Sequence, residues 1–448
     1  MKADRSVSRT RADRMMVYCH DSVGIGHLRR SIAICERLTS RFPGSSFLIA
    51  TGTPYVPLFT IPRGMDYVKL PALNKRSDGV YESKFLPLRT RQLLKCRRAL
   101  LLATVQYFRP SIFLVDKNPV GVCRELVPVL QWLRRNCPQT RVVFGMRDIE
   151  DTPEATIRQW NDQDVPRVLE ECYDEIWVYG SQSVYDVVRE YRLPQSVCNK
   201  LSYTGYIERN PCDHDTSEAR RHESTEGRRE RKGQRDEGTK GRRECPIVDR
   251  QSSIVNPQSP IPNHQHVLVT VGGGSDGVEL LGKYIAEAAG TVAKRGGRST
   301  IVAGPDVPRG AARWLRQAAL DLPETRWLDH TGCMSCLMRS ADLVVSMGGY
   351  NTLCEIASYG KAALVVPRVF PRYEQAIRAT IWERLGVIST AHPATLTPRR
   401  LSERVLEMLD NPRAPDSSRL DLHGLDRIAD KCAVLWNGGR SVEAPVRV

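Results

Sequence analysis

One segment of this sequence combines residue types and a spacing that suit a phosphorylated sugar. An apolar run over residues 341–345 leads into Ser346 and the pair Gly348-Gly349, and a helical pattern follows from position 350 or 351. Paired glycines let the backbone pass close to a ligand, and the first N–H groups of a helix have no partner within it. A strand, a glycine turn and a helix N-terminus in this order predict a site for a phosphate or diphosphate.

A carboxylate and a polar cluster follow this turn in an order that extends the same interpretation. Glu355 lies one helical turn further on, where it could accept hydrogen bonds from the vicinal hydroxyls of a ribose. A second apolar run, residues 362–367, leads into groups that could bind a sugar or offset phosphate charge: Arg368, Arg372, Glu374 and Gln375. The segment therefore predicts a nucleotide-sugar pocket, although glycine turns of this kind also occur for packing reasons alone.

A histidine near the N-terminus is a candidate general base. The first strand pattern is followed by Gly24, Gly26 and His27 at the start of a helical pattern. A histidine placed there can be neutral at cellular pH, as a base must be. A capping or packing histidine is the competing interpretation.

Two charged clusters end other predicted strands of the same half. Asp116 begins one cluster, and the other contains Arg147, Asp148 and Asp151. Because parallel strands end at one edge of a sheet, His27, Asp116 and Asp148 could converge, and any of them could activate an acceptor hydroxyl. The alternative is a structural role, with Asp148 or Asp151 capping the helix that follows Pro153.

Apolar runs alternate with helical patterns through both halves of the chain. This rhythm predicts mainly parallel, doubly wound sheets in two Rossmann-like domains that face an interdomain cleft. In the first half the expected strands are 15–20, 47–51, 112–115, 142–146 and 176–179, with helices over 28–38, 88–108, 122–135, from 156 onward and over 184–191. In the second half the expected strands are 267–271, 300–303, 326–328 and 341–345, with helices over 278–295 and 311–320.

Composition excludes several classes of protein. No run approaches the ~20 apolar residues that cross a bilayer, and the basic N-terminus lacks a signal-peptide core, so a cytoplasmic location is expected. The net charge of +15 is diffuse, and no nucleic-acid module is legible. Residues 88–108 mix leucines with basic side chains, so peripheral contact with the inner face of a membrane is the alternative to an ordinary packed helix. The CxxC at Cys333 and Cys336 has no second pair, which favours a helix start over metal or redox chemistry.

The chain resembles the GT-B glycosyltransferases that carry a family 28 C-terminal domain, and in particular a MurG-like branch of them. The motifs that carry the resemblance are GxGHxxR at residues 24–30, SxGGxxTxxE at 346–355, and its continuation over 367–379. The chain is expected to comprise a disordered basic tail (1–14), an N-terminal acceptor domain (15–211), a disordered linker insertion (212–263), a C-terminal nucleotide-sugar donor domain (264–411), and a C-terminal helix and tail (412–448). The disorder of the insertion is predicted from its polar composition, and the insertion is unlike the compact linker of the family.

This resemblance implies a glycosyltransferase that transfers a hexose or N-acetylhexosamine from a nucleotide-diphosphate sugar, usually a UDP-sugar, with inversion, no cofactor and no obligatory metal. It implies His27 as the base, and the strand-end pattern leaves Asp148 as the alternative. The donor-binding residues expected from the resemblance and the residue pattern together are Gly273, Gly274, Ser275, Ser346, Gly348, Gly349, Asn351, Thr352, Glu355, Arg372, Glu374 and Gln375. The residues expected on the acceptor side of the cleft are Gly24, Gly26, Arg30, Asp116 and Arg147.

One departure from the family pattern leaves the donor sugar open. The peptidoglycan enzyme of this group has two adjacent glutamines and then an asparagine where this chain has Glu374, Gln375 and Arg378. Glu374 and Arg378 could pair with each other across one turn of helix, or they could recognise a different sugar. The acceptor is equally open between a lipid-linked sugar, a polysaccharide, a protein and a small molecule. The alternative functions are a UDP-sugar epimerase of the same fold and a catalytically idle nucleotide-sugar-binding scaffold.

Overall fold

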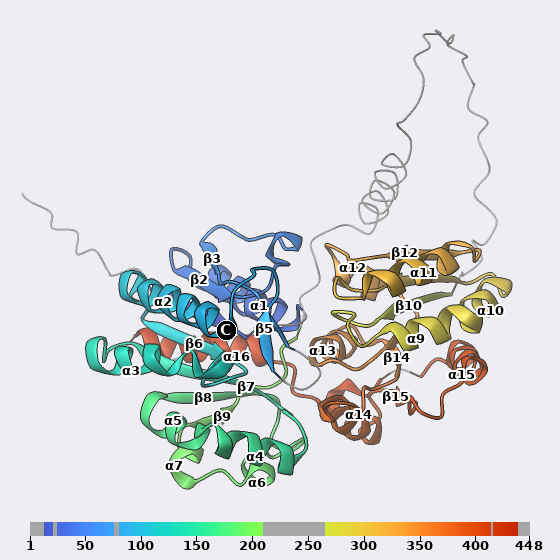
Figure 1. Ribbon diagram of the computed structural model, residues 1–448. Coiled ribbons are helices and arrows are strands. Elements are labelled where there is room, and N and C mark those ends of the chain that lie inside the picture. The colour runs from blue at the N-terminus through green and yellow to red at the C-terminus, as the bar shows by residue number, and fades with distance from the viewer. Residues whose placement is uncertain (1–12, 21–24, 76–79, 209–264, 414, 438–448) are drawn as a thin grey trace, which may run out of the picture.

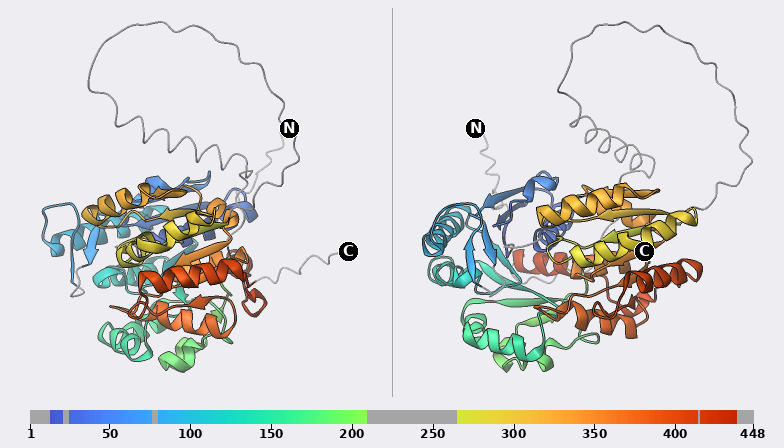
Figure 2. Two further views of the ribbon diagram at one scale, coloured as in Figure 1. Left: turned by 90° about the vertical axis from the view of Figure 1, so that its right-hand side faces the viewer. Right: turned by 45° about the vertical axis from the view of Figure 1, so that its right-hand side comes forward.

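Parallel strands build two separate sheets in this protein (Figure 1). The computed structural model describes residues 13–20, 25–75, 80–208, 265–413 and 415–437 of the 448-residue chain. The expected tail over 1–14 lies almost entirely outside these residues, and the expected linker insertion over 212–263 lies wholly outside them. The right-hand view of Figure 2 separates the blue-to-green first domain from the yellow-to-orange second domain.

The first domain is a seven-stranded sheet in the order β3-β2-β1-β6-β7-β8-β9, with every neighbouring pair parallel. Its central strands are apolar over their whole length because helices cover both faces. The strands are β1 (Arg14–Cys19), β2 (Ser46–Thr51), β3 (Met65–Lys69), β6 (Ile112–Asp116), β7 (Arg141–Arg147), β8 (Glu175–Tyr179) and β9 (Leu201–Tyr203). A small antiparallel pair, β4 (Leu73–Lys75) and β5 (Tyr81–Ser83), lies beside this sheet.

The helices of the first domain present apolar faces to this sheet. They are α1 (Gly26–Arg41), α2 (Thr90–Phe108), α3 (Val127–Asn136), α4 (Pro153–Asp162), α5 (Val165–Cys172), α6 (Val187–Tyr191) and α7 (Gln195–Cys198). In α2, Leu93, Leu101 and Val105 are buried, and Arg97 is buried in an ion pair with Glu125 at 2.6 Å. This helix is therefore packed in the domain along one face. No helix among the described residues is long and apolar enough to cross a membrane.

The second domain repeats the plan with six parallel strands in the order β12-β11-β10-β13-β14-β15. The strands are β10 (His266–Thr270), β11 (Arg298–Val302), β12 (Thr325–Leu328), β13 (Leu343–Ser346), β14 (Ala362–Val365) and β15 (Ser389–Thr390). The helices are α9 (Val278–Lys283), α10 (Ala289–Lys294), α11 (Arg309–Leu320), α12 (Met334–Ser340), α13 (Tyr350–Ser358), α14 (Glu374–Arg384) and α15 (Pro398–Asp410). The expectation of two doubly wound, Rossmann-like sheets is confirmed.

The strand order of both sheets places one reversal of direction in each domain. The chain moves outward from β1 in one direction and then returns to β6 on its other side; β10 and β13 hold the same places in the second domain. Ligands of open α/β sheets bind beyond the carboxyl ends of the two strands that flank such a reversal. His27 follows β1 and Asp116 ends β6, whereas the glycines at 272–274 follow β10 and those at 348–349 follow β13.

The last helix, α16 (Gly424–Trp436), returns from the second domain and packs on the first (Figure 1). The ring of Trp436 meets Phe42 edge-on at 4.9 Å, and its indole N–H donates to Ser111 Oγ at 3.0 Å. Ile428 and Cys432 are fully buried in the same core. The C-terminal helix therefore completes the hydrophobic core of the first domain.

Two expected helices are interrupted. The helix expected over 122–135 is a 3₁₀ turn (Val122–Arg124) followed by α3, because Cys123 adopts a left-handed conformation (φ 49°) that ends regular helix. The helix expected over 278–295 contains a π-helical segment (Tyr284–Ala288) between α9 and α10. The half-exposed edge strand β3 was not expected, because its buried Met65 stands among exposed or partly exposed residues.

Shortening Ile428 should destabilise the first domain even though this residue belongs to the last helix of the chain. We expect Ile428→Ala to lower the free energy of unfolding by about 2–5 kcal/mol, because a fully buried side chain leaves a cavity. Chemical denaturation measures this loss. The matched control is Val434→Ala on the same helix, whose side chain is 46% exposed and whose change should stay within about 0.5 kcal/mol. Equal losses in the two variants would contradict this packing.

Candidate functional site

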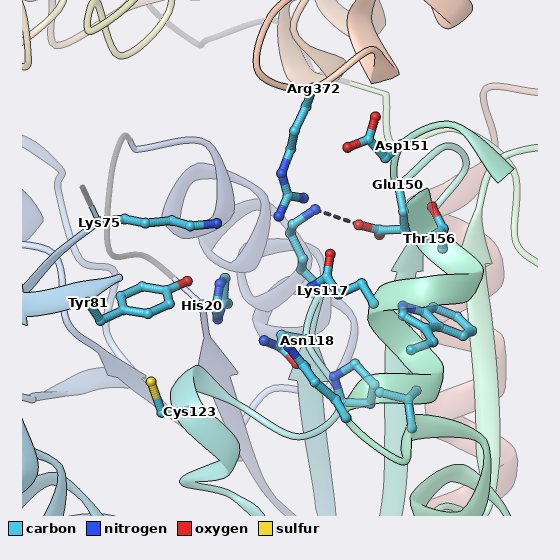
Figure 3. A pocket seen from close by; sticks show the side chains of 15 residues that line it. His20, Lys75, Tyr81, Lys117, Asn118, Cys123, Glu150, Asp151, Thr156 and Arg372 are labelled. Atoms are coloured by element: carbon cyan, nitrogen blue, oxygen red, sulfur yellow. Dashed lines mark hydrogen bonds and ion pairs between the residues drawn. The ribbon is translucent and has the colours of Figure 1, made fainter. Parts of the chain in front are cut away.

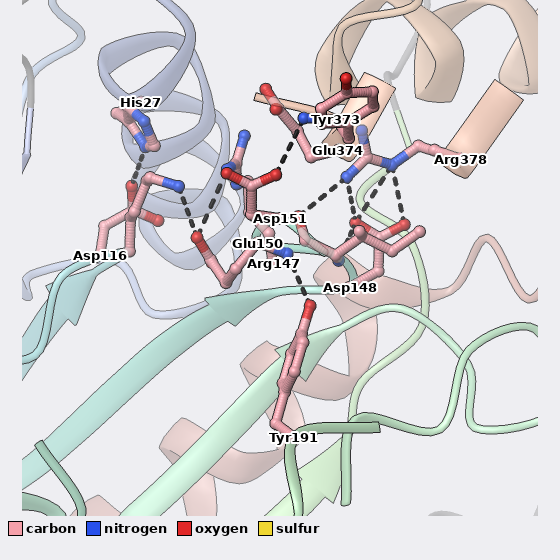
Figure 4. A network of polar contacts seen from close by, with 12 residues as sticks. His27, Asp116, Arg147, Asp148, Glu150, Asp151, Tyr191, Tyr373, Glu374 and Arg378 are labelled. Carbon is pink, nitrogen blue, oxygen red and sulfur yellow. Dashed lines mark hydrogen bonds and ion pairs between the residues drawn. The ribbon is translucent and has the colours of Figure 1, made fainter. Parts of the chain in front are cut away.

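A network of charged side chains lines the seam where the two domains meet (Figure 4). His27, at the start of α1, lies at one end of this network, and its Nδ1 lies 2.6 Å from Asp116 Oδ2. The contact follows from the sheet, because β1 and β6 are neighbours and Cys19 stands opposite Asp116 in their register. The structure thus brings two of the three residues expected to converge into direct contact.

Asp116 is held as a carboxylate by Arg30. The Nε and Nη2 atoms of Arg30 donate to the two oxygens of Asp116 at 2.9 and 2.7 Å, and both residues are 1% exposed. This contact and the one to His27 keep the pKa of Asp116 well below its usual range, against the opposing effect of burial. The ionised carboxylate is therefore available to orient the imidazole.

The environment of His27 keeps its imidazole neutral. Burial lowers the pKa of His27 to about 4, since the opposing effect of Asp116 is smaller and Arg30 and Arg147 also disfavour a positive charge. Nδ1 lies 2.6 Å from Asp116 Oδ2 and also 2.8 Å from Arg30 Nη2, which can only donate. In the tautomer that carries its proton on Nδ1, toward the carboxylate, the lone pair of Nε2 can accept a proton. A neutral imidazole held in this way can act as a general base.

Arg30 also joins the two domains. Its guanidinium lies 5.4 Å from the ring centre of Tyr179 in the first domain and 5.4 Å from that of Tyr350 in the second. The hydroxyl of Tyr350 donates to the carbonyl oxygen of Tyr179 at 3.0 Å and accepts from the amide of Ile207 at 3.2 Å. The position of the base is therefore coupled to the placement of α13.

The wall formed by the second domain consists of two glycine turns. Gly274 has φ +97°, and a side chain there would meet the carbonyl oxygen of Ala303 at 2.5 Å. Gly348 has φ +74°, and a side chain there would meet Val365 at 2.6 Å. Larger residues fit neither place, so both turns keep their backbone next to the seam. No side chain caps the N-terminus of α13 among the described residues, which leaves its first N–H groups for an anion.

Glu355 faces the first domain from one turn inside α13. Its Oε1 accepts from Arg29 Nη2 on α1, and its side chain is 1% exposed. Close by, Asn351 donates through Nδ2 to the carbonyl oxygen of Gly26 at 2.7 Å. The carboxylate expected to bind a ribose is thus held, in this structure, by an arginine from the opposite domain.

The structure places Asp148 differently from the expected convergence. Both of its oxygens accept from Arg378, at 2.9 Å from Nε and 2.7 Å from Nη2, and both side chains are buried. This ion pair ties α14 to the strand-end loop after β7. Asp148 therefore forms a contact between the two domains, and this geometry favours His27 over Asp148 as the general base.

Two predicted interactions are wrong: an ion pair between Glu374 and Arg378, and the capping of α4 by an aspartate. Glu374 binds Arg368 at 2.5 Å, because Arg378 is drawn across the seam to Asp148. Thr152 caps α4 by accepting from Ala155 N at 3.3 Å. Asp151 accepts instead from the amide of Tyr373 across the seam, at 2.9 Å.

The remaining expected donor-side residues lie along the second wall. Ser346 ends β13 and is buried, and Gln375 accepts through Oε1 from the amide of Arg368 at 3.0 Å. Arg372 lies on the loop before α14 and points toward the first domain (Figure 3). The other expected donor-side residues are all described by the structure: Gly273, Gly274, Ser275, Gly349 and Thr352. Gly24, which was expected on the acceptor side, lies outside the described part of the chain.

Two pockets open along this seam. The α12 pocket, of about 470 Å³, lies between α1 and the strand ends of the second domain, and Arg29, Gly272, Gly304 and His330 are among its lining residues. The Lys117 pocket, of about 340 Å³, lies at the strand ends of the first domain, and Lys117, Glu150 and Arg372 are among its lining residues. The first lies next to the glycine turns, and the second lies next to the candidate base.

Several lining residues were not foreseen. The segment from His330 to Ser335, which runs from the loop after β12 into the first turn of α12, lines the α12 pocket. Its position after a strand end was the available signal. Lys117 was visible next to Asp116 in the sequence, whereas Lys75 comes from the small antiparallel pair and carried no signal. Cys333 accepts from the amide of Cys336 at the start of α12, as a helix start requires.

Part of the chain is similar in sequence to known proteins. Residues 266–431 match the glycosyltransferase family 28 C-terminal domain. The chain is 28% identical over 154 residues to the UDP-N-acetylglucosamine–N-acetylmuramyl-(pentapeptide) pyrophosphoryl-undecaprenol N-acetylglucosamine transferase of Gloeobacter violaceus, which covers 34% of this chain and 42% of that protein. The chain thus matches less than half the length of this curated relative.

Solved structures show the same fold at low identity. The calicheamicin glycosyltransferase has a TM-score of 0.56 at 12% identity, covering 96% of this chain and all of the other. A UDP-GlcNAc 2-epimerase from Neisseria meningitidis has a TM-score of 0.54 at 10% identity, with the same coverage. The two facing sheets therefore have the GT-B fold. The family 28 match covers residues 266–431, which include the second domain and most of α16.

The neutral state of His27 should make stability depend on pH. The pKa of His27 in the folded protein, about 4, lies below the value of about 6.5 in an unfolded chain, so its contribution is present above pH 6.5 and is lost as the pH falls toward 4. We expect the wild-type protein to lose about 3 kcal/mol more than His27→Gln between these limits, as measured by denaturation at each pH. His392→Gln, which changes an exposed imidazole, is the matched control. Parallel profiles for wild type and His27→Gln would contradict the assignment.

Proposed function

We propose that this protein is an inverting glycosyltransferase that transfers a hexose or N-acetylhexosamine from a UDP-sugar to a hydroxyl group of an acceptor. The observation that carries the proposal is the position of His27, held by Asp116, directly across the seam from Glu355 and the glycine turns. The family 28 domain and the name of the curated relative support UDP as the carrier.

In the proposed reaction His27 accepts the proton of the acceptor hydroxyl. Nε2 takes this proton, and the carboxylate of Asp116 stabilises the imidazolium that results. The acceptor oxygen attacks the anomeric carbon of the donor from the face opposite the diphosphate, and the bond to the diphosphate breaks. The configuration at the anomeric carbon is inverted by this single displacement.

The leaving diphosphate would be stabilised by the second domain. Its negative charge would face the backbone of the turn at 272–275 and the uncapped N-terminus of α13, where N–H groups are fixed in advance. The ribose would displace Arg29 from Glu355, and the uracil ring of UDP would lie in the α12 pocket. Among the described residues no cluster of three or more His, Cys, Asp or Glu side chains could hold a metal ion, and metal independence is part of the proposal.

Replacing His27 should abolish transfer without preventing nucleotide binding. We expect His27→Ala to lower kcat by about 10²–10⁴-fold, because the acceptor loses its general base. The dissociation constant for UDP, measured by calorimetry, should stay within about twofold, since the α12 pocket does not include this side chain. His392→Ala is the control. An unchanged kcat in His27→Ala would place the base elsewhere.

Replacing Glu355 should have the opposite pattern. We expect Glu355→Ala to weaken UDP binding about tenfold or more, because the hydroxyls of a buried ribose would lose their acceptor. Calorimetry with UDP measures the change, and Glu287→Ala, at an exposed position of the second domain, is the matched control. Unchanged affinity in Glu355→Ala would contradict its role.

The fold is shared with UDP-GlcNAc 2-epimerases, which defines the competing outcome of these assays. An epimerase would convert UDP-N-acetylglucosamine in the absence of any acceptor. The proposed transferase releases UDP in quantity only when an acceptor is supplied. Product analysis with and without acceptor separates the two activities.

A further inference from the structure

Two cysteines lie side by side at the edge of the α12 pocket. Sγ of Cys333 is 2.9 Å from Sγ of Cys336, and both residues are present as thiols and are partly exposed. The sulfur–sulfur bond of a disulfide measures about 2.05 Å, so the two atoms need to approach by only about 0.9 Å to form one. The CxxC was expected to serve as a helix start, and the structure adds that its two thiols are close enough to react with each other.

The surroundings of the pair suit oxidation and not metal binding. Among the described residues, no third His, Cys, Asp or Glu side chain joins the two thiols in a group that could hold a metal ion. Six of the eleven described cysteines are buried, and burial raises the pKa of the Cys35 and Cys432 thiols, which keeps them protonated and unreactive. Cys333 and Cys336 can be reached from solvent, as a redox-active pair must be.

The positions of the two cysteines give them different roles. Cys333 is among the residues that line the α12 pocket, and Cys336, within the first turn of α12, is not among them. Sγ of Cys333 accepts from the amide of Cys336 at 3.3 Å, a contact that stabilises negative charge on this sulfur. The thiolate is the nucleophile in thiol–disulfide exchange. The geometry therefore makes Cys333 the attacking thiol and Cys336 the thiol that resolves the product.

We propose that Cys333 and Cys336 form a redox-active dithiol that reacts with low-molecular-weight disulfides such as oxidised glutathione. The thiolate of Cys333 attacks one sulfur of the small disulfide, forms a mixed disulfide and releases one small thiolate. The thiolate of Cys336 then attacks Sγ of Cys333, closes the intrachain disulfide and releases the second small thiolate. The two cysteines together lose two electrons and two protons, which convert the small disulfide into two thiols.

Resolution by Cys336 matters because of where the mixed disulfide lies. A glutathione group on Sγ of Cys333 projects into the α12 pocket, whose volume is about 470 Å³ and in which the proposed function places the uracil ring of UDP. The intrachain disulfide adds no atoms to this pocket. Cys336 therefore clears a bulky adduct from the nucleotide site. This consequence rests on the proposed function, whereas formation of the disulfide does not.

The first measurement maps the disulfide in the full-length protein. Both thiols fall in one tryptic peptide, residues 327–339, which contains none of the other cysteines of the chain. After incubation with oxidised glutathione, we expect the mass of this peptide to fall by two hydrogen atoms and to recover on reduction. A disulfide is used in place of a peroxide because Met334 and Met338 lie in the same peptide and a peroxide would oxidise them.

The matched control for this mapping is Cys96→Ser, which removes an exposed thiol of α2 and should give the same result as wild type. A wild-type peptide that remains a dithiol, or that retains glutathione, would overturn the inference. This measurement needs no variant of the pair, so it decides the inference whether or not substitutions at Cys333 or Cys336 are tolerated.

The second measurement separates the two roles by calorimetry with UDP before and after the same treatment. We expect treated Cys336→Ser to retain glutathione on Cys333 and to bind UDP at least about tenfold more weakly than before treatment. Treated wild type and treated Cys333→Ser, whose remaining thiol does not line the pocket, should change by less than about twofold. Equal losses of affinity in wild type and Cys336→Ser would contradict the resolving role of Cys336. Absence of UDP binding by the untreated wild type would instead contradict the proposed function.

Discussion

The guanidinium of Arg30 is charged and buried, and its ion pair with Asp116 offsets the free-energy cost of burying that charge. An isolated buried charge is strongly destabilising, whereas a bidentate pair with both partners fixed is not. The same carboxylate contacts Nδ1 of His27, and the same guanidinium lies against aromatic rings from both domains. One buried pair therefore links folding, domain placement and the readiness of the base.

Polar contacts also cross the rest of the seam, beside aromatic contacts such as that of Tyr206 with Trp382. Arg29 with Glu355, Arg378 with Asp148, and Tyr373 with Asp151 each join an element of one domain to an element of the other. Interfaces between domains that move are typically more polar than a core. Such contacts can be exchanged for bonds to a nucleotide or a sugar, so the ligands and the opposite domain compete for the same atoms.

Much of the fold was legible in the sequence because its signals are local. Apolar runs that end in glycine gave the positions of β1, β10 and β13, and the parallel arrangement predicted that His27 would meet Asp116. The partner of Arg378 was not legible. A helical pair with Glu374 is worth only a few tenths of a kcal/mol, and a buried carboxylate 230 residues away competes successfully for the guanidinium. Lys75 joins its pocket through a small hairpin whose placement no periodicity reveals.

The return of α16 to the first domain has a consequence for how this protein is made. On the ribosome, residues 13–208 emerge long before Gly424–Trp436, at a rate on the order of 5–20 residues per second. For ten seconds or more, roughly, the first domain has an open apolar face where Phe42, Phe47 and the far side of α1 wait for the last helix. All elements of the second domain are therefore synthesised before the first domain receives its last helix. During this time the exposed apolar face of the first domain is a surface that chaperones could bind.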